Sequence, residues 1–133
     1  MKIRTYSEIF NEILSKNSSD YTKGLNILEN ILPELAKKYD VSKLDTSKIR
    51  DVLFHPIPII FYLTDGKLKG KRILDLGCGS KTSREMDIPI SSVYEPWLCR
   101  ALLELGACPV GIDREDNSGE EFESHRVDLN KPD

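Results

Sequence analysis

The sequence predicts an α/β fold, with a helical region in residues 1–70 followed by about three parallel strands in residues 71–133. Apolar residues recur at helical spacing through the first region. The second region holds three short apolar runs, each with an acidic residue at or near its end, and one amphipathic segment between the first two. Strand, helix, strand, connection and strand in this order predict a parallel sheet built by crossover connections.

Several helices are predicted before the first strand. Ser7 is a candidate N-cap of the first helix, and the second has a long apolar face that Pro33 is expected to kink or split. The third helix is expected to start at Thr46 or Ser47. Proline is favoured in the first turn of a helix, so Pro56 marks the start of a fourth.

The strands are predicted at residues 72–76, 108–113 and 124–129, from short apolar runs bounded by glycine or polar residues. A helix over 95–105 joins the first two strands. The segment "NSGEE" at 117–121 is expected to be a solvated loop. Because parallel strands end at the same edge of a sheet, the acids that close these runs are expected to meet there.

Composition indicates a soluble globular domain. The 133 residues are 39% hydrophobic and 31% charged, which excludes a disordered or membrane-embedded protein. The net charge of −3 gives no electrostatic basis for binding bulk nucleic acid. The three cysteines form neither an even set nor a CxxC pair, so we expect no disulfide framework and no metal site. Cysteines of this kind suit a reducing cytoplasm, where we expect the protein to be.

The segment "ILDLGCGSKT" reads as a buried strand that runs into a tight glycine turn, and three ligands are considered for it. A phosphate-binding P-loop needs glycine directly before its lysine and again five residues earlier. Here Ser80 and Asp75 stand at those two places before Lys81. The absence of both glycines argues against a P-loop.

A dinucleotide fingerprint, G-x-G-x-x-G, is the second reading of the turn. Gly77 and Gly79 fit its first two positions, but Thr82 occupies the third, where glycine permits close packing of helix on strand. The ribose-binding acid is expected about 20 residues further on. Asp113 lies 34 residues beyond Gly79. An NAD-linked half-domain is therefore the weaker alternative.

The third reading rests on three segments in order, "ILDLGCGS", "VGID" and "VDLNKP". They resemble the first three motifs of class I, Rossmann-like, S-adenosylmethionine-dependent methyltransferases. The resemblance covers residues 72–132 and implies a Rossmann-like three-layer sandwich with S-adenosylmethionine as the cofactor. It also implies a set of cofactor-binding residues, namely Asp75, Gly77, Cys78, Gly79, Asp113, Arg114, Asp128 and Leu129.

The resemblance implies a role for several of these positions. The glycine turn lets the backbone approach the cofactor, Asp113 holds the ribose hydroxyls, and Asp128 meets the adenine amine. Two departures are visible. Lys81 stands where the family often has a third glycine, and "SKTSREMDIPISSVY" (80–94) delays the helix that usually follows. We interpret this segment as an inserted loop that folds over the methionine end of the cofactor.

Only the first part of the family's sheet is recognisable, so the fold is expected to be an incomplete Rossmann-like sandwich and no catalytic residue is named. The function expected is that of a methyltransferase, or of its cofactor-binding N-terminal part, with an unidentified substrate. The alternative is a non-catalytic cofactor-binding or assembly module that depends on a partner chain. The first strand is expected to be a sheet edge, either covered by the N-terminal helices or paired in a homodimer.

Overall fold

The computed structural model describes residues 3–15, 19–81 and 94–131. The elements in chain order are α1 (Tyr6–Ser15), α2 (Ser19–Lys38), α3 (Lys43–Leu53), α4 (Pro56–Leu63), β1 (Arg72–Leu76), α5 (Trp97–Glu104), β2 (Cys108–Asp113) and β3 (Glu123–Arg126). This order of helices followed by alternating strand and helix confirms the α/β class. Most of the segment interpreted as an inserted loop lies outside the described residues.

The three strands form one parallel sheet in the order β1, β2, β3. α5 connects β1 to β2 and packs on β2, whereas residues 114–122 lead from β2 to β3 without a helix. In the register, Leu76 pairs with Ile112 and Asp113 pairs with Arg126. The carboxyl ends of all three strands therefore meet at one edge, as the sequence predicts.

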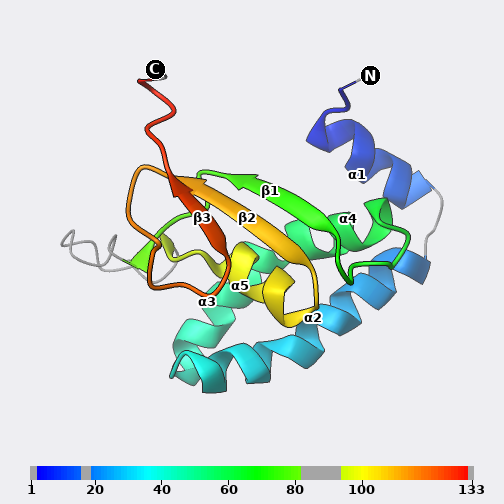
Figure 1. Cartoon of the computed structure of the whole chain (residues 1–133). Coiled ribbons are helices and arrows are strands. Elements are labelled where there is room, and N and C mark those ends of the chain that lie inside the picture. The colour runs from blue at the N-terminus through cyan, green and yellow to red at the C-terminus, as the bar shows by residue number, and fades with distance from the viewer. Residues whose placement is uncertain (1–2, 16–18, 82–93, 132–133) are drawn as a thin grey trace.

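Helices cover one face of this sheet (Figure 1). α5 lies against the sheet, and α2, α3 and α4 contact α5 from the side away from it. On the opposite face the side chains of Leu74 and Leu76 are each 59% exposed. The described residues therefore form two layers, and a second helical layer, as in the expected three-layer sandwich, is not among them.

The larger of two hydrophobic clusters joins the helical region to the sheet. Leu35 of α2, Leu53 of α3 and Leu102 of α5 are fully buried in it, and Ile73 of β1 packs against it. Burial of apolar surface stabilises a fold by about 25 cal/mol per Å². Because the helices and the sheet share this buried surface, the core crosses the boundary expected near residue 70.

Two helices begin earlier than the sequence predicts, because different residues cap them. Thr5 Oγ1 accepts the N–H of Glu8 at 3.2 Å, and Glu8 Oε2 accepts the N–H of Thr5 at 3.0 Å. This reciprocal pair is a capping box, so Thr5 rather than Ser7 caps α1. α3 is capped in a similar way by Ser42, whose Oγ accepts the N–H of Asp45 at 3.1 Å.

α2 is one helix of 20 residues that contains Pro33, so the expected split does not occur. It crosses α4 at close range. A Cβ built on Gly24 of α2 would lie 2.7 Å from Pro58 Cα. The absence of a side chain at position 24 therefore allows the two helix backbones to approach.

β3 ends before the predicted strand at 124–129 does. The N–H of Val127 still donates to Asp113 O at 2.9 Å, but Asp128 Oδ1 then accepts the N–H of Asn130 at 2.9 Å. An aspartate that binds the backbone two residues ahead forms an Asx turn. Asp128 therefore begins a turn beyond the strand instead of lying within it.

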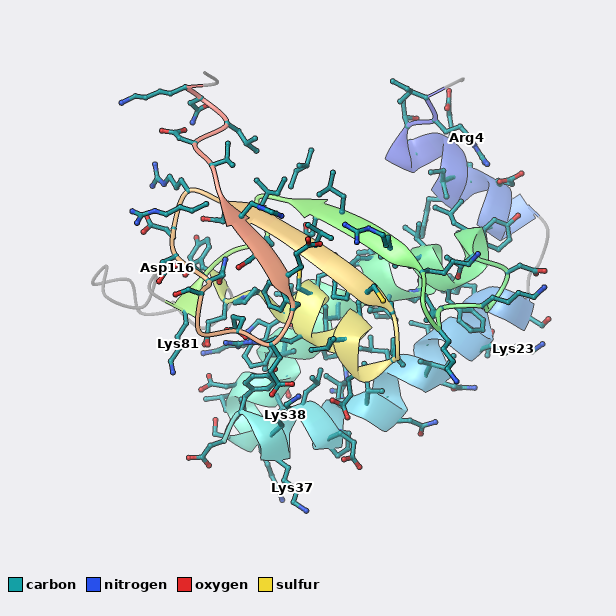
Figure 2. The ribbon with its side chains drawn as sticks, in the orientation of Figure 1. Arg4, Lys23, Lys37, Lys38, Lys81 and Asp116 are labelled. Carbon is teal, nitrogen blue, oxygen red and sulfur yellow. The ribbon has the colours of Figure 1, made fainter. Side chains whose placement is uncertain are left out.

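Ion pairs at the surface link α2 to the second half of the chain. Lys38 Nζ lies 3.0 Å from Glu121 Oε2 and 3.9 Å from Glu104 Oε2 (Figure 2). Exposed pairs of this kind contribute about 0–1 kcal/mol each.

Within the part of the chain that the structure describes, no helix has both the length and the apolar character that crossing a membrane requires.

We expect Leu102→Ala to lower the free energy of unfolding by about 2–5 kcal/mol, because it leaves a cavity in a packed core. Leu102 is 0% exposed, whereas Leu44 on α3 is 72% exposed. Leu44→Ala is therefore the matched control, with an expected change within about 0.5 kcal/mol. Urea unfolding of both variants, followed by circular dichroism, tests this. A loss of less than about 1 kcal/mol for Leu102→Ala would contradict it.

Candidate functional site

A surface hollow of about 220 Å³ lies at the carboxyl edge of the sheet. We call it the carboxyl-edge hollow. It is lined by Gly77, Asp113, Arg114, Val127, Asp128, Leu129 and Asn130. These residues come from the turn after β1, the end of β2 and the turn after β3, so the parallel register of the strands is what brings them together.

The hollow contains most of the residues that the sequence singles out. The predicted residues in its lining are Gly77, Asp113, Arg114, Asp128 and Leu129. The other three predicted residues, Asp75, Cys78 and Gly79, are not in the lining. The predicted set therefore divides into residues that face the hollow and residues whose contacts lie inside the protein.

The backbone N–H groups of the glycine turn all donate within the protein. Those of Gly77 and Cys78 donate to Ile112 O at 2.7 and 3.1 Å. The N–H of Gly79 donates to Asp113 Oδ2 at 2.9 Å, and that of Ser80 to Tyr94 O at 2.8 Å. A phosphate bound at such a turn needs N–H groups that point at it. This conformation of residues 77–80 offers none, which argues against both the P-loop and the dinucleotide readings.

The two glycines of the turn serve different purposes, although both have positive φ, 75° and 88°. A Cβ on Gly77 would meet no atom within 4 Å, so this backbone is open to a ligand. A Cβ on Gly79 would lie 2.1 Å from Tyr94 O. Gly79 therefore allows the turn to pack against the chain that leads into α5, and only Gly77 gives a ligand access.

Asp113, the last residue of β2, joins the turn to the hollow. Its Oδ2 accepts the N–H of Gly79, and its Oδ1 accepts the N–H of Glu115 at 2.9 Å. A carboxylate has about four lone-pair sites, so each oxygen can still accept a hydrogen bond from a ligand. Asp113 is thus held in place by the backbone and remains able to bind hydroxyl groups.

Asp75 lies on the helix side of the sheet, away from the hollow. The thiol of Cys99 on α5 donates to Asp75 Oδ2 at 3.7 Å. Burial raises the pKa of Asp75, the Cys99 hydrogen bond lowers it, and the charge of Asp113 raises it, with a net increase. Asp75 therefore links β1 to α5 through the Cys99 thiol and does not take part in the hollow.

Cys78 and Cys99 are buried side by side beneath the sheet. A Cβ on Gly111 would lie 2.7 Å from Cys78 Sγ and 3.2 Å from Cys99 Sγ, so the glycine makes room for both sulfur atoms. The hydrogen bond to Cys78, burial and the Asp75 carboxylate raise the pKa of Cys99 far above its ordinary value. A thiol held protonated in this way is a poor nucleophile, so Cys99 has a structural role.

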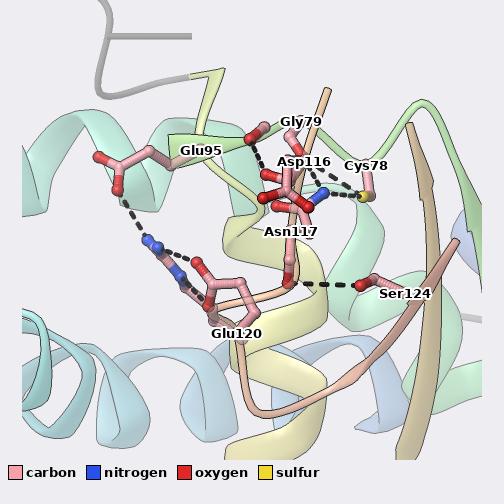
Figure 3. Close-up of polar contacts among 9 residues, drawn as sticks. Cys78, Gly79, Glu95, Asp116, Asn117, Glu120 and Ser124 are labelled. Atoms are coloured by element: carbon pink, nitrogen blue, oxygen red, sulfur yellow. Dashed lines mark hydrogen bonds and ion pairs between the residues drawn. The ribbon is translucent and has the colours of Figure 1, made fainter. Parts of the chain in front are cut away.

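Asn117 supports the turn from behind, and the sequence analysis missed it by treating 117–121 as solvated. Asn117 is buried, and its Nδ2 donates to Gly79 O at 2.9 Å and to Cys78 Sγ at 3.5 Å (Figure 3). Ser80 Oγ donates to the neighbouring Asp116 O at 2.6 Å. A buried asparagine in a polar loop has no signature in sequence periodicity, so only the fold identifies it.

Arg100 on α5 is the second residue that the sequence analysis missed. It donates from Nη1 to Glu95 Oε1 at 3.0 Å and from Nε to Glu120 Oε2 at 3.1 Å (Figure 3). Its guanidinium lies 4.2 Å from the centre of the Tyr39 ring and 4.6 Å from that of Trp97. Burial lowers the pKa of Arg100, but the two carboxylates outweigh it and hold that pKa above its ordinary value.

The remaining residues of the hollow are held by local contacts. Arg126 Nε donates to Arg114 O at 2.9 Å, and the Arg114 side chain points to solvent with Glu115 3.6 Å away. The side chains of Val127 and Leu129 are about half exposed and give the hollow its apolar lining. No group of three or more metal-binding side chains occurs among the residues that the structure describes.

Compared with known proteins, the chain matches no protein-family model, no curated protein and no solved structure. The interpretation of the hollow therefore rests on its own residues.

We expect Gly79→Ala to destabilise the protein more than Gly77→Ala. Both substitutions place an alanine at positive φ, which costs about 1–2 kcal/mol. Only Gly79→Ala also brings a Cβ against Tyr94 O. The difference between the two free energies of unfolding is expected to be at least about 2 kcal/mol, measured by urea unfolding. Equal losses would show that the close contact at Gly79 does not matter.

We expect the difference in free energy of unfolding between Asp75→Asn and the wild type to depend on pH. Burial raises the pKa of Asp75 in the folded state above its unfolded value. The folded state then binds the proton more tightly, so the contribution of Asp75 to stability falls as pH rises through that pKa. Asp75→Asn should compare more favourably with the wild type at about pH 7 than at about pH 4. Urea unfolding of both proteins between about pH 4 and pH 7 measures this difference. A difference in free energy of unfolding that does not change with pH would contradict the prediction.

Proposed function

We propose that this chain binds S-adenosylmethionine in the carboxyl-edge hollow, as a methyltransferase or as the cofactor-binding part of one. The observation that supports this is the composition of the hollow. Residues from three separate sequence segments, represented by Gly77, Asp113 and Asp128, line one small surface hollow. Ligands of open α/β sheets bind beyond the carboxyl ends of the strands, where this hollow lies.

The residues present fit the nucleoside end of the cofactor. Asp113 has acceptor sites left for a ribose diol, and Val127 and Leu129 supply apolar surface for a base. Gly77 leaves room for the ligand beside the backbone. The N–H groups of residues 77–80 are already used, so the amino-acid end of the cofactor must find other partners.

The proposal includes a Rossmann-like fold, with which the parallel order β1, β2, β3 and the α5 crossover agree. The bound cofactor would supply a methyl group on a sulfonium for direct displacement by a nucleophile. The contribution of this chain would be to hold and orient the cofactor and to exclude water from part of it. The Asp113 carboxylate is suited to orienting the cofactor because two backbone hydrogen bonds fix its position before any ligand binds.

A second candidate is a cofactor-binding module without catalysis. The specific observation in its favour is that the residues lining the hollow include no histidine, cysteine, tyrosine or lysine. Proton transfer near neutral pH most often uses histidine, and the two carboxylates in the lining, those of Asp113 and Asp128, already accept backbone N–H groups. Both candidates require cofactor binding, and a methyl-transfer assay with the complete protein would separate them.

We expect S-adenosylhomocysteine to bind with micromolar affinity in calorimetric titration, and Asp113→Ala to weaken binding tenfold or more, about 1.4 kcal/mol. Asp113 also braces the turn, so a second variant is needed that leaves the brace intact. Val127→Trp would fill the hollow while keeping the backbone bond from Val127 to Asp113 O. It should abolish binding without loss of stability.

Ile3→Trp, the same kind of enlargement at an exposed residue remote from the hollow, is the matched control and should bind like the wild type. Titration with NAD is the competing arm. Binding of NAD without binding of S-adenosylhomocysteine would overturn the proposal in favour of a dinucleotide site. Equal binding by the wild type and Val127→Trp would place the ligand outside the hollow.

A further inference from the structure

A second cavity, of about 290 Å³, lies where the end of α2, the helix α5 and the connection from β2 to β3 meet. We call it the lateral cavity. Its lining includes Tyr39, Lys81, Arg100, Asp116, Asn117 and Glu120. None of these residues lines the carboxyl-edge hollow, so the two are separate places on the molecule.

The guanidinium of Arg100 brings unused hydrogen-bond donors to this cavity. Its Nε and Nη2 donate to the two carboxylate oxygens of Glu120, and its Nη1 donates to Glu95 Oε1 (Figure 3). A guanidinium carries five N–H groups, so two remain. No described residue accepts either of them. A ligand with an acceptor group can therefore bind Arg100 without breaking its ion pairs.

Asn117 brings an unused acceptor to the same cavity. Its side chain is buried, and its Nδ2 donates to Gly79 O. Its Oδ1 accepts no hydrogen bond from any residue that the structure describes. A buried acceptor without a partner costs about 1–3 kcal/mol. A ligand donor that reached Oδ1 would remove that cost.

Lys81 and Asp116 are the exposed members of the lining. Ser80 Oγ donates to Asp116 O at 2.6 Å, which holds the two segments together, and Figure 2 shows both side chains on the same side of the molecule. Lys81 forms no ion pair with an acid in the described ranges. Hydrogen bonds from Ser118 lower the pKa of Asp116, so its carboxylate is ionised at neutral pH.

The charges of the lining balance. Lys81 and Arg100 are cations, and Asp116 and Glu120 are anions. A ligand with a net charge would disturb this balance and would lose hydration without full compensation. A zwitterion brings one charge of each sign, with donors and acceptors close together. The lining therefore favours a zwitterion over a simple anion or cation.

We propose that the lateral cavity binds a free α-amino acid with an apolar side chain. The ammonium group would donate to Asn117 Oδ1, and the carboxylate would accept the unused Arg100 N–H groups and face Lys81. The side chain would lie along the Tyr39 ring. Cavities for drug-sized ligands have volumes of about 300–1,000 Å³, so this one suits a single amino acid better than a nucleotide. The proposal does not depend on what binds in the carboxyl-edge hollow.

Calorimetric titration of the whole chain with L-leucine, L-methionine and L-phenylalanine tests the proposal. At least one should bind with a dissociation constant of about 1 mM or lower. The amide of that amino acid lacks the carboxylate, and its N-acetyl derivative lacks the ammonium. Each should bind at least about tenfold more weakly. No binding of any of the three at about 10 mM, or equal binding of the N-acetyl derivative, would overturn the proposal.

Nuclear magnetic resonance locates the bound amino acid. Signals of the Asn117 side-chain amide and of the Arg100 Nε–H should shift on titration, whereas that of the Asn130 side chain, in the hollow, should not. Shifts confined to the hollow would overturn the proposal.

Two pairs of variants test the lining without breaking the ion pairs of Arg100. Gly119 also lines the cavity, and a Cβ built on it meets no atom within 4 Å. Gly119→Trp should therefore fill the cavity and abolish binding while stability is kept, and Ile3→Trp, at an exposed residue outside the lining, is the matched control. Lys81→Gln should weaken binding at least about threefold, whereas Lys37→Gln, at an exposed lysine of α2, should not. Unchanged binding by Gly119→Trp would overturn the proposal.

Discussion

The attachment of the glycine turn to the end of β2 is the constraint on which the rest of the structure depends. Two consecutive N–H groups, of Gly77 and Cys78, converge on Ile112 O, and the next, of Gly79, meets the Asp113 carboxylate. Hydrogen bonds to a charged acceptor are about twice as strong as neutral ones. β1 and β2 therefore cannot slide relative to each other without breaking several bonds at once, and the carboxyl-edge hollow keeps its shape.

A buried charge network holds the opposite side of the same turn. Arg100, whose side chain is only 2% exposed, ties α5 to Glu120 in the connection from β2 to β3. Removing one member of a buried ion pair leaves an uncompensated charge and commonly costs 3–5 kcal/mol. The network fixes the connection that carries Asn117, and Asn117 in turn binds Gly79 O. The turn is thus held by Asp113 on one side and by Asn117 on the other.

Neighbouring residues of the turn and of the strand ends have different roles: some pack inside the protein, and others face the hollow. The side chains of Asp75 and Cys78 lie on the helix side of the sheet, where both are in contact with α5 or its Cys99 side chain. Gly77 and Asp113 face the hollow. A ligand would therefore meet a preorganised surface, which lowers the ordering cost of binding.

The sequence by itself determined the α/β class, the bounds of β1 and β2, the position of α5 and the segments that form the hollow. These features depend on local periodicity, on proline and glycine, and on acids at strand ends, which are readable without contacts. Only the tertiary structure decided the roles of the two acids. Asp75 and Asp113 both occupy helix-facing positions by strand alternation, but Asp75 lies beneath α5, whereas Asp113 is the last residue of its strand and reaches the turn. Burial of Arg100 and Asn117 was likewise decided by packing between distant segments, for which a polar side chain gives no local signal.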